Sequence, residues 1–215
     1  MKTVKRCALL VFACMLLAGC VPGNTGGNQA IAAYQQVLDG SRTLVYEGQT
    51  VHLSEVQAGS INGPLRFSGI ALVDVDADEA AEVVIAVNLD SYDAYGSLVL
   101  HWEDGIVYGY DFVYRAMMNL KADGTFSFSS GAADSGFGRA SFQNGAAEIV
   151  SLAYSEMLID GSIQYHLGDE TVSEDAFLEA ILAQDEKADD AWYAYTDVDL
   201  CAIAEGRAST GKFRQ

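Results

Sequence analysis

Basic residues and recognisable catalytic motifs are scarce in this chain of 215 residues. It has 12 Lys and Arg against 30 Asp and Glu, so its formal net charge is −18 and its sequence pI is near 4.2. Because so negative a surface repels phosphate backbones, we expect no nucleic-acid binding. The H-E-x-x-H, G-x-S-x-G and complete Walker patterns are also missing, so we favour a function without catalysis.

Long apolar runs are missing as well. The apolar run at the N-terminus extends only from Cys7 to Leu17, short of the roughly 20 residues that a membrane-spanning helix needs. Lys2, Lys5 and Arg6 form a basic patch before this run, and small residues follow it. This arrangement is typical of a secretory signal rather than of a membrane span.

The signal ends in a motif that is typical of one class of protein. Leu17-Ala18-Gly19-Cys20 resembles the lipobox of bacterial lipoproteins. The resemblance implies that residues 1–19 are a lipoprotein signal peptide and that Cys20 becomes the first mature residue, with a diacylglycerol on its sulfur. Two acyl chains anchor a protein stably, since each buried CH₂ contributes about 0.8 kcal/mol. The alternative is an ordinary cleaved signal in which Cys20 has no special role.

Lipidation at Cys20 also implies a location. Lipoproteins of this class are held at the cell membrane on its extracytoplasmic face. Because the next residue, Val21, is not acidic, the resemblance implies the outer membrane if the organism is diderm. Three of the 12 basic residues leave with the signal, so the mature chain has nine basic residues against 30 acidic ones.

Few cysteines remain for disulfides. Cys7 and Cys14 lie in the signal and Cys20 is assigned to the lipid, which leaves Cys201 alone in the mature chain. Cys201 lies in an apolar stretch, so we predict an unpaired, buried thiol that packs as a small hydrophobic side chain. The three histidines, at positions 52, 101 and 166, are isolated from one another, so we do not expect a zinc site.

Behind the signal we expect a single α+β domain. Gly and small polar residues over 20–28 predict a flexible tether, residues 29–206 form the domain, and residues 207–215 are expected to fray. The elements follow in the order helix, run of hairpins, helices. That order predicts an antiparallel β-meander sheet flanked by an N-terminal helix and C-terminal helices.

Apolar spacing and turn signals locate these elements. Helical spacing predicts a helix over 29–38, another after the N-cap Ser173 and a short third one after Thr196. Between them, short apolar runs alternate with tight turns such as Asp104-Gly105 and Asp160-Gly161, which predict antiparallel hairpins. We expect strands over 70–75, 82–87, 97–102, 106–114, 125–129, 138–142, 148–154 and 162–167.

One segment has the side chains of a metal site. Between Asp74 and Glu82 the sequence reads DVDADEAAE, so acids occupy positions 1, 3 and 5 and recur at position 9. A hard cation such as Ca²⁺ takes about 6–8 oxygen ligands, which alternate side chains of a tight loop can supply. The segment resembles the Asp-x-Asp-x-Asp-Gly calcium loops of integrin-like and VCBS-type repeats. It is also similar to the DxDxDGxxEL segment of uncharacterised lipoproteins of gut Firmicutes.

The resemblance implies a set of calcium ligands. The side chains of Asp74, Asp76 and Asp78 would ligate, Ala80 would supply its carbonyl, and Glu82 would complete or orient the shell. Bound Ca²⁺ would be structural rather than catalytic.

The segment also departs from the calcium loops that it resembles. Ala77 and Glu79 occupy positions where those loops have glycine, so a left-handed backbone there would be strained. The alternative is an acidic hairpin connection without metal, in which Asp74 and Asp76 accept hydrogen bonds from backbone amides. Both interpretations stay open.

Aromatic residues alternate along the strand expected over 106–114. Tyr108, Tyr110, Phe112 and Tyr114 therefore point to one face of that strand. We favour a buried core face, because aromatic side chains bury large areas. The alternative is an exposed platform that stacks against sugar rings or another ligand, formed by Trp102, Tyr108, Tyr110 and Tyr114.

The sequence identifies neither a ligand nor a reaction. We expect a lipid-anchored extracytoplasmic protein that binds an envelope component, a saccharide or a protein without catalysis. The alternative is a small envelope hydrolase that uses carboxylates. It would need a cleft with two acids about 5–10 Å apart, one of them with a raised pKa. No catalytic residue is assigned.

Overall fold

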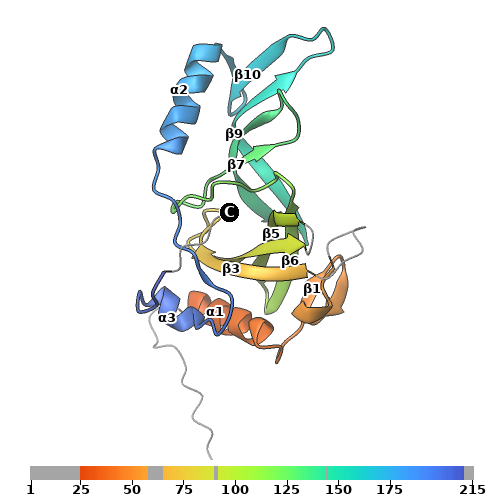
Figure 1. Cartoon of the computed structure of the whole chain (residues 1–215), viewed down its shortest axis with the longest axis vertical. Coiled ribbons are helices and arrows are strands. Elements are labelled where there is room, and N and C mark those ends of the chain that lie inside the picture. Colours follow the sequence, from red (N-terminus) through yellow and green to blue (C-terminus); the bar gives the residue numbers. More distant parts are fainter. Residues whose placement is uncertain (1–24, 58–64, 90–91, 144, 211–215) are drawn as a thin grey trace, which may run out of the picture.

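The computed structural model describes residues 25–57, 65–89, 92–143 and 145–210. It has the predicted α+β fold, with an N-terminal helix, antiparallel strands and C-terminal helices (Figure 1). The helices are α1 (Thr25–Leu38), α2 (Glu174–Asp185) and α3 (Leu200–Ala204), with a 3₁₀ turn at Leu53–Glu55. The strands are β1 (Leu44–Tyr46), β2 (Gln49–Val51), β3 (Leu65–Val73), β4 (Glu82–Leu89), β5 (Tyr92–Glu103), β6 (Ile106–Val113), β7 (Phe126–Ser129), β8 (Ser135–Gln143), β9 (Ala146–Met157), β10 (Ile163–Leu167), β11 (Glu170–Val172) and β12 (Tyr193–Ala194).

Seven strands form the first sheet, in the order β12-β3-β4-β5-β6-β1-β2. Neighbouring strands are antiparallel except β1 and β6, which are parallel. Its inner strand β4 is apolar over consecutive residues, which is typical of a strand that is buried on both faces. Alternate residues of β4 therefore enter two cores, Ile85 on one face of the sheet and Val84 on the other.

α1 and α3 cover one face of the first sheet. Tyr34 and Val37 of α1 pack with Leu200 of α3 against Ile85 in the first core. Figure 1 shows both helices on the same side of this sheet. Because α1 begins at Thr25, the last four residues of the predicted 20–28 tether are helical.

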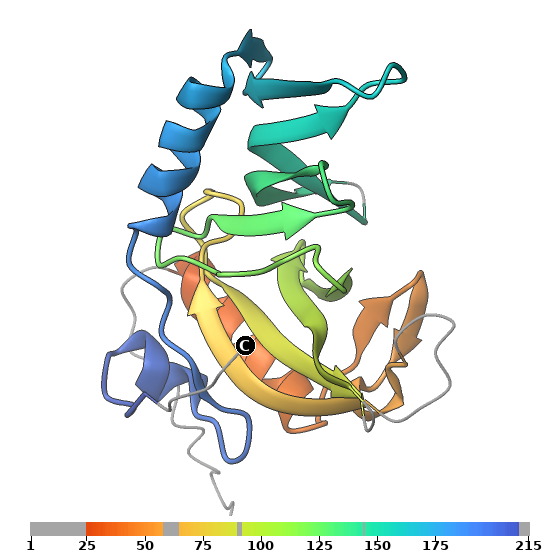
Figure 2. The same ribbon diagram turned by 45° about the horizontal axis from the view of Figure 1, so that its top comes forward.

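Five strands form a second, fully antiparallel sheet in the order β11-β10-β9-β8-β7. The predicted meander is thus divided between two sheets. Phe126 of β7 and Ala140 of β8 pack against Phe112 of β6 in the second core. α2 packs on the second sheet through Phe177, whose ring centroid lies 5.1 Å from that of Tyr165 in β10. Figure 2 shows the second sheet stacked on the first, with α2 along its side.

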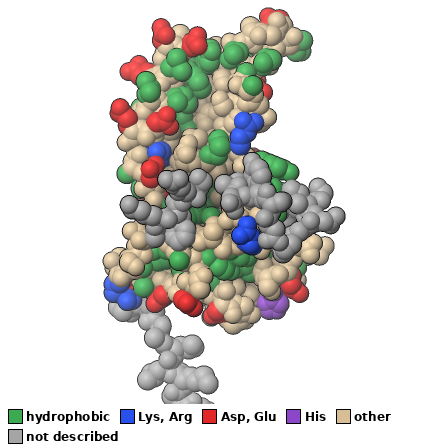
Figure 3. Space-filling model, viewed as in Figure 1, with side chains coloured by type: hydrophobic (Ala, Val, Ile, Leu, Met, Phe, Trp, Pro, Cys, Tyr) green, Lys and Arg blue, Asp and Glu red, His purple; other side chains and the backbone are tan. Residues whose placement is uncertain are grey.

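Acidic side chains are spread widely over the surface. In Figure 3 they occur both around α2 and at the opposite end of the molecule, where α1 and α3 lie. Within the described residues, no helix is long and apolar enough to cross a membrane.

Cys201 does not have the predicted unpaired thiol. It lies in the first turn of α3, is half-buried, and is disulfide-bonded, so that prediction is wrong. Its partner lies outside the described residues, as do the chain's other cysteines, Cys7, Cys14 and Cys20. The predicted lipidation site therefore also lies outside the described residues.

Candidate metal centre

The acidic segment connects two neighbouring strands of the first sheet, as predicted. β3 ends at Val73 and β4 begins at Glu82, and these two residues pair with each other at the base of the loop. Val75 is fully buried in the second core, and its carbonyl accepts a hydrogen bond from the Ala140 amide at 3.0 Å. Because Ala140 belongs to β8, the loop is attached to both sheets.

Carboxylates within the loop accept hydrogen bonds from its own backbone. Asp74 Oδ1 accepts from the amides of Ala77 at 2.6 Å and Asp78 at 3.2 Å, and its Oδ2 accepts from the Glu79 amide at 3.0 Å. Asp76 Oδ1 accepts from the Asp78 amide at 3.3 Å. The hydrogen bonds that the metal-free interpretation predicts are thus present, and they fix the path of the loop.

Two residues of the loop have a left-handed backbone. The φ angles of Ala77 and Glu79 are 66° and 72°. A residue with a Cβ in this conformation costs about 1–2 kcal/mol relative to the right-handed one. These are the positions at which the loops that it resembles have glycine. The segment therefore adopts a strained backbone at the two positions where the sequence predicts strain.

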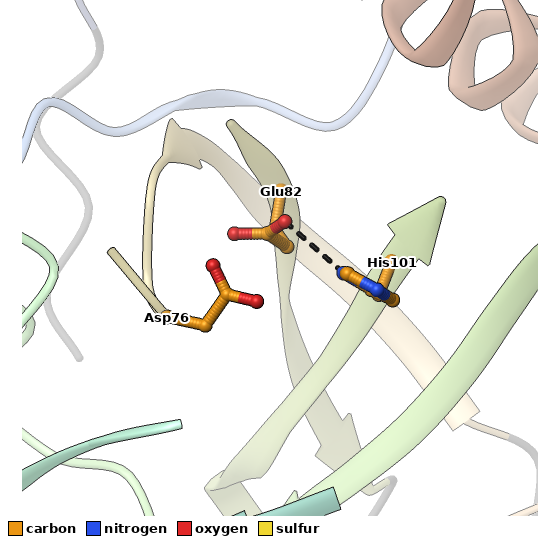
Figure 4. A group of neighbouring side chains, drawn as sticks. All are labelled: Asp76, Glu82 and His101. Atoms are coloured by element: carbon orange, nitrogen blue, oxygen red, sulfur yellow. Dashed lines mark hydrogen bonds and ion pairs between the residues drawn. The ribbon is translucent and has the colours of Figure 1, made fainter. Parts of the chain in front are cut away.

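The acidic side chains of the loop converge. Carboxylate oxygens of Asp74, Asp76 and Asp78 lie within 4.8 Å of one another. Asp76 also belongs to a second group, in which ligand atoms of Asp76, Glu82 and His101 lie within the same distance of one another. In Figure 4, Asp76 and Glu82 point toward each other and His101 reaches Glu82 from β5. We call these five residues the acidic centre.

Glu82 and His101 form the buried side of the acidic centre. Their residues are only 1% and 7% exposed. Glu82 Oε1 lies 3.2 Å from His101 Nδ1, and Glu82 Oε2 accepts a hydrogen bond from the Val75 amide at 3.0 Å. The ring of Phe142 stacks on His101, with 4.4 Å between centroids. Both oxygens of Glu82 therefore have protein partners.

Burial and the crowding of negative charge shift the proton affinities of the acidic centre. Burial raises the pKa of Glu82 to about 7, although its hydrogen bond with His101 acts in the opposite direction. Burial and the charge of Asp78 raise the pKa of Asp76 to about 6. Burial by itself would lower the pKa of His101, but the hydrogen bond and negative charge of Glu82 raise it overall. A cation bound among these carboxylates would favour their ionised forms.

His101 belongs to the acidic centre although the sequence did not predict it there. The register of β4 and β5 places His101 there, because Val83 is opposite Leu100 in this strand pair. The next residues along these antiparallel strands, Glu82 and His101, are therefore neighbours. Isolated histidines do not predict such a partner, because the sequence alone does not give the register of the two strands.

A cavity of about 290 Å³ lies beside the acidic centre. Asp78, Glu79 and Glu82 line it together with Tyr34 of α1 and Trp102 of β5. Burial raises the pKa of Tyr34 far above its usual value, and the charge of Glu82 raises it further. The tyrosine is therefore neutral, and it places an uncharged hydroxyl among the acids.

The four residues of the predicted ligand platform do not come together. Trp102 is opposite Val107 and packs on the first core, whereas Tyr110 packs on the second core, so the two lie on opposite faces of the sheet. Tyr114 lies beyond the end of β6, with a left-handed φ of 58° and 64% of the residue exposed. The predicted platform is therefore wrong as a unit, and only Tyr108 and Tyr110 remain together.

The favoured interpretation of this strand is confirmed in part. Phe112 is buried in the second core, and Tyr110 packs at the edge of that core. Tyr108 and Tyr110 stack with their ring centroids 6.1 Å apart, and both stay partly exposed. The strand is thus a core element at one end and lines the surface at the other.

Comparison with known proteins gave no relative: no protein-family model, no curated protein and no solved structure matches this chain. The function proposed below is therefore supported by the sequence and by the geometry of the described residues.

Proposed function

We propose that this protein is a lipid-anchored extracytoplasmic domain that binds Ca²⁺ at the acidic centre. It serves without catalysis as a binding module for an envelope component, a saccharide or a protein. The observation that carries the calcium proposal is the convergence of Asp74, Asp76 and Asp78 within 4.8 Å. Carboxylates so close together repel one another unless a proton or a cation lies between them.

The chemistry of the donors favours Ca²⁺ over a transition metal. Asp74, Asp76 and Asp78 present oxygen ligands, and the Ala80 carbonyl would add another. Hard cations prefer such ligands, whereas zinc and copper sites favour imidazole and thiolate. Glu82 orients the loop from the buried side, because both of its oxygens have protein partners.

An extracytoplasmic location would suit a site of low affinity. Calcium loops of extracellular modules bind with Kd values of about 10⁻⁴–10⁻³ M. One feature of this loop weakens binding, namely the raised pKa of Asp76. Protons and Ca²⁺ would therefore compete for the same carboxylate. The lipidation predicted at Cys20 would expose the loop to the medium outside the cytosol.

The carboxylate-hydrolase alternative has weaker support. Asp76 and Glu82 both have raised pKa values, although their ligand atoms lie within 4.8 Å of each other, short of the separation of about 5–10 Å that such a pair needs. However, Glu82 is 1% exposed, and its two oxygens have Val75 and His101 as partners. Such a carboxylate has no open side for a substrate, which favours a structural role.

Thermal unfolding in a chelator and then in increasing Ca²⁺ tests the calcium proposal. Binding to the folded state alone raises stability by about 2.7 kcal/mol at a ligand concentration of 100 Kd, so Tm should rise with Ca²⁺. Asp76→Asn keeps the size of the side chain and should remove most of this rise. Glu179→Gln, which removes one charge from the exposed surface of α2, should keep it.

NaCl at matched ionic strength separates specific binding from the screening of a net charge of −18. A Tm that does not respond to Ca²⁺ beyond the NaCl control would contradict the calcium proposal. So would an Asp76→Asn variant that responds as the unmodified protein does.

A further inference from the structure

We propose that an apolar surface formed by α2 and the β9–β10 hairpin docks a basic amphipathic helix of another protein. We call it the α2–hairpin surface, and its six residues are Met157, Leu158, Ile159, Ile163, Leu178 and Leu182. The inference rests on the proposed binding function and deepens it, because it names the chemistry of a protein partner.

Exposed hydrophobic side chains are concentrated in this part of the molecule. Of the ten large hydrophobic residues that are exposed in the described part of the chain, eight lie between Val150 and Leu182. The other two are Ile106 and Tyr114. In Figure 3, hydrophobic side chains gather over α2 and the second sheet, with acidic side chains beside them. Single exposed hydrophobic residues are normal, whereas a gathering of them marks an interaction surface.

The hairpin supplies two side chains from the sheet face on which α2 packs. Met157 is opposite Ile163 in the register of β9 and β10, so both point to one face. Tyr165, two residues further along β10, points to the same face and packs on Phe177 of α2. Met157 and Ile163 therefore lie on the α2 side of the sheet, yet they stay 55% and 44% exposed. At the tip of the hairpin, Ile159 is fully exposed.

α2 supplies two leucines that its own packing does not use. The buried residues of this helix are Phe177 and Gln184, which lie two turns apart on one side of it. Leu178 and Leu182 lie one turn apart on another side and are exposed. Rows of side chains with this spacing pack into the grooves of a second helix. The exposed leucines thus present to solvent the pattern with which helices pack together.

The charge around this surface determines which partner fits. From residue 140 to residue 186 the chain has ten Asp and Glu and no Lys or Arg. Among the described residues, only one of these acids has an ion-pair partner, namely Glu156 with His166. Lys187, which follows this range, pairs with Asp123. A partner with basic residues beside its apolar face therefore complements this surface and is attracted to it.

A second copy of this chain fits the α2–hairpin surface less well. In a symmetric dimer the same patch of both copies meets itself. The acids of residues 140–186 would then face those of the other copy. Like charges that oppose each other across an interface weaken association, so the surface favours a basic partner over self-association.

Fluorescence anisotropy with dye-labelled peptides at constant Ca²⁺ tests the inference. The probe is acetyl-(Leu-Lys-Lys-Leu-Leu-Lys-Leu)₂-amide, whose leucines lie on one face of a helix. One comparison peptide has glutamate in place of each lysine, and another has the composition of the probe in a scrambled order. We expect the probe to bind and the two comparison peptides to bind at least about 10-fold more weakly. Failure of the probe to bind would overturn the inference, and so would equal binding of the scrambled peptide.

Variants of the protein locate the binding surface. Leu178→Gln and Leu182→Gln should each weaken binding of the probe about 10-fold, because each removes an apolar contact from the interface. Ile106→Gln is the matched control, since it replaces an exposed hydrophobic residue of the first sheet, and it should leave the affinity unchanged. Equal losses of affinity in Leu182→Gln and Ile106→Gln would contradict the assignment to this surface. Thermal unfolding of each variant shows whether it keeps the fold.

Sedimentation of the protein alone tests the second copy as an occupant. A monomer whose α2–hairpin surface binds the probe supports the inference. A dimer that Leu182→Gln dissociates would overturn it, because a second copy would then cover the surface.

Failure of the proposed function would look different. Glycan and peptide arrays that yield no ligand at all would contradict the binding function itself. A saccharide ligand from the arrays, whose affinity does not change in Leu182→Gln, together with a probe that does not bind, would leave the binding function intact. That result would overturn only the inference about a basic protein partner.

Discussion

In the absence of Ca²⁺, Glu82 should contribute to the response of the domain's stability to pH. Its pKa in the folded state is about 7, raised from 4.5 by burial, so the folded chain binds more protons than the unfolded chain between these two pH values. Stability should therefore fall as pH rises from about 4.5 to about 7. His101 acts in the same direction, because its raised pKa means that the stability of its charged form is lost as pH rises through that pKa.

Glu82→Gln should flatten this pH dependence. The amide keeps the shape of the side chain and cannot titrate, so the fall in unfolding free energy between pH 4.5 and 7 should shrink by up to about 3 kcal/mol. Urea unfolding across this range, in the presence of a chelator, measures the effect. Glu179→Gln serves as the control for the loss of one acid. Equal slopes in Glu82→Gln and the unmodified protein would show that Glu82 does not take up the proton.

At the scale of single residues, the sequence predicted the acids of the site but not their surroundings. Alternate positions in one loop predicted that Asp74, Asp76 and Asp78 meet, because a tight turn brings such side chains together. His101 is 19 residues from Glu82 in the chain and reaches it across a strand pair. Only the register of β4 and β5 reveals that contact.

At the scale of elements, the acidic loop depends on a turn elsewhere in the chain. Gly124 has a left-handed φ of 77°, and a Cβ built on it would collide with the carbonyl oxygen of Asp74. The Asp123-Gly124 turn thus packs directly against the first residue of the loop. A side chain at position 124 would have to push that residue aside.

Gly124→Ala should therefore destabilise the domain and weaken its response to Ca²⁺. We expect a loss of at least about 1–3 kcal/mol from overpacking, in addition to the cost of a left-handed alanine. Gly161→Ala is the matched control, since Gly161 has a φ of 84° and a Cβ added to it would meet no atom within 4 Å. Urea unfolding and calcium titration of the two variants measure the difference. Equal losses of unfolding free energy and of calcium response in the two variants would show that the acidic loop does not depend on the contact between Gly124 and Asp74.

The longer elements could be predicted and the shortest could not. All eight predicted strands are present, because alternation and tight Gly turns extend over enough residues to be recognised. β1, β2, β11 and β12 have only two or three residues, too few to show a period. β1 is nevertheless part of the first sheet, in which it pairs in parallel with β6.

At the scale of the whole molecule, the division into two sheets could not be predicted. Apolar runs indicate that a strand is buried on both faces, but they do not identify what covers each face. β6 and β7 follow each other in sequence and belong to different sheets. Trp102 and Tyr110 lie on opposite faces of the first sheet, so the shared platform that was the alternative interpretation does not form.

The predicted lipid anchor is tested on the whole protein. Mass spectrometry of material from membranes of the native host should show a chain that begins at Cys20 and carries a diacylglyceryl group. One sulfur cannot carry both a thioether and a disulfide, so Cys201 should not be bonded to Cys20 in that material. Cys20→Ser should move the protein from the membrane fraction to the soluble fraction. An intact leader, or a first residue without lipid, would contradict the anchor.

Because α1 begins early in the chain, it limits how far the folded domain of such a lipid-anchored protein can lie from the membrane surface. Only four residues separate Cys20 from Thr25, and even a fully stretched link of that length reaches about 17 Å. α1 would therefore lie close to the lipid headgroups. The second sheet, at the opposite end of the molecule from α1, would face away from the membrane (Figure 1). A partner bound by such an anchored domain would therefore be held close to the bilayer surface.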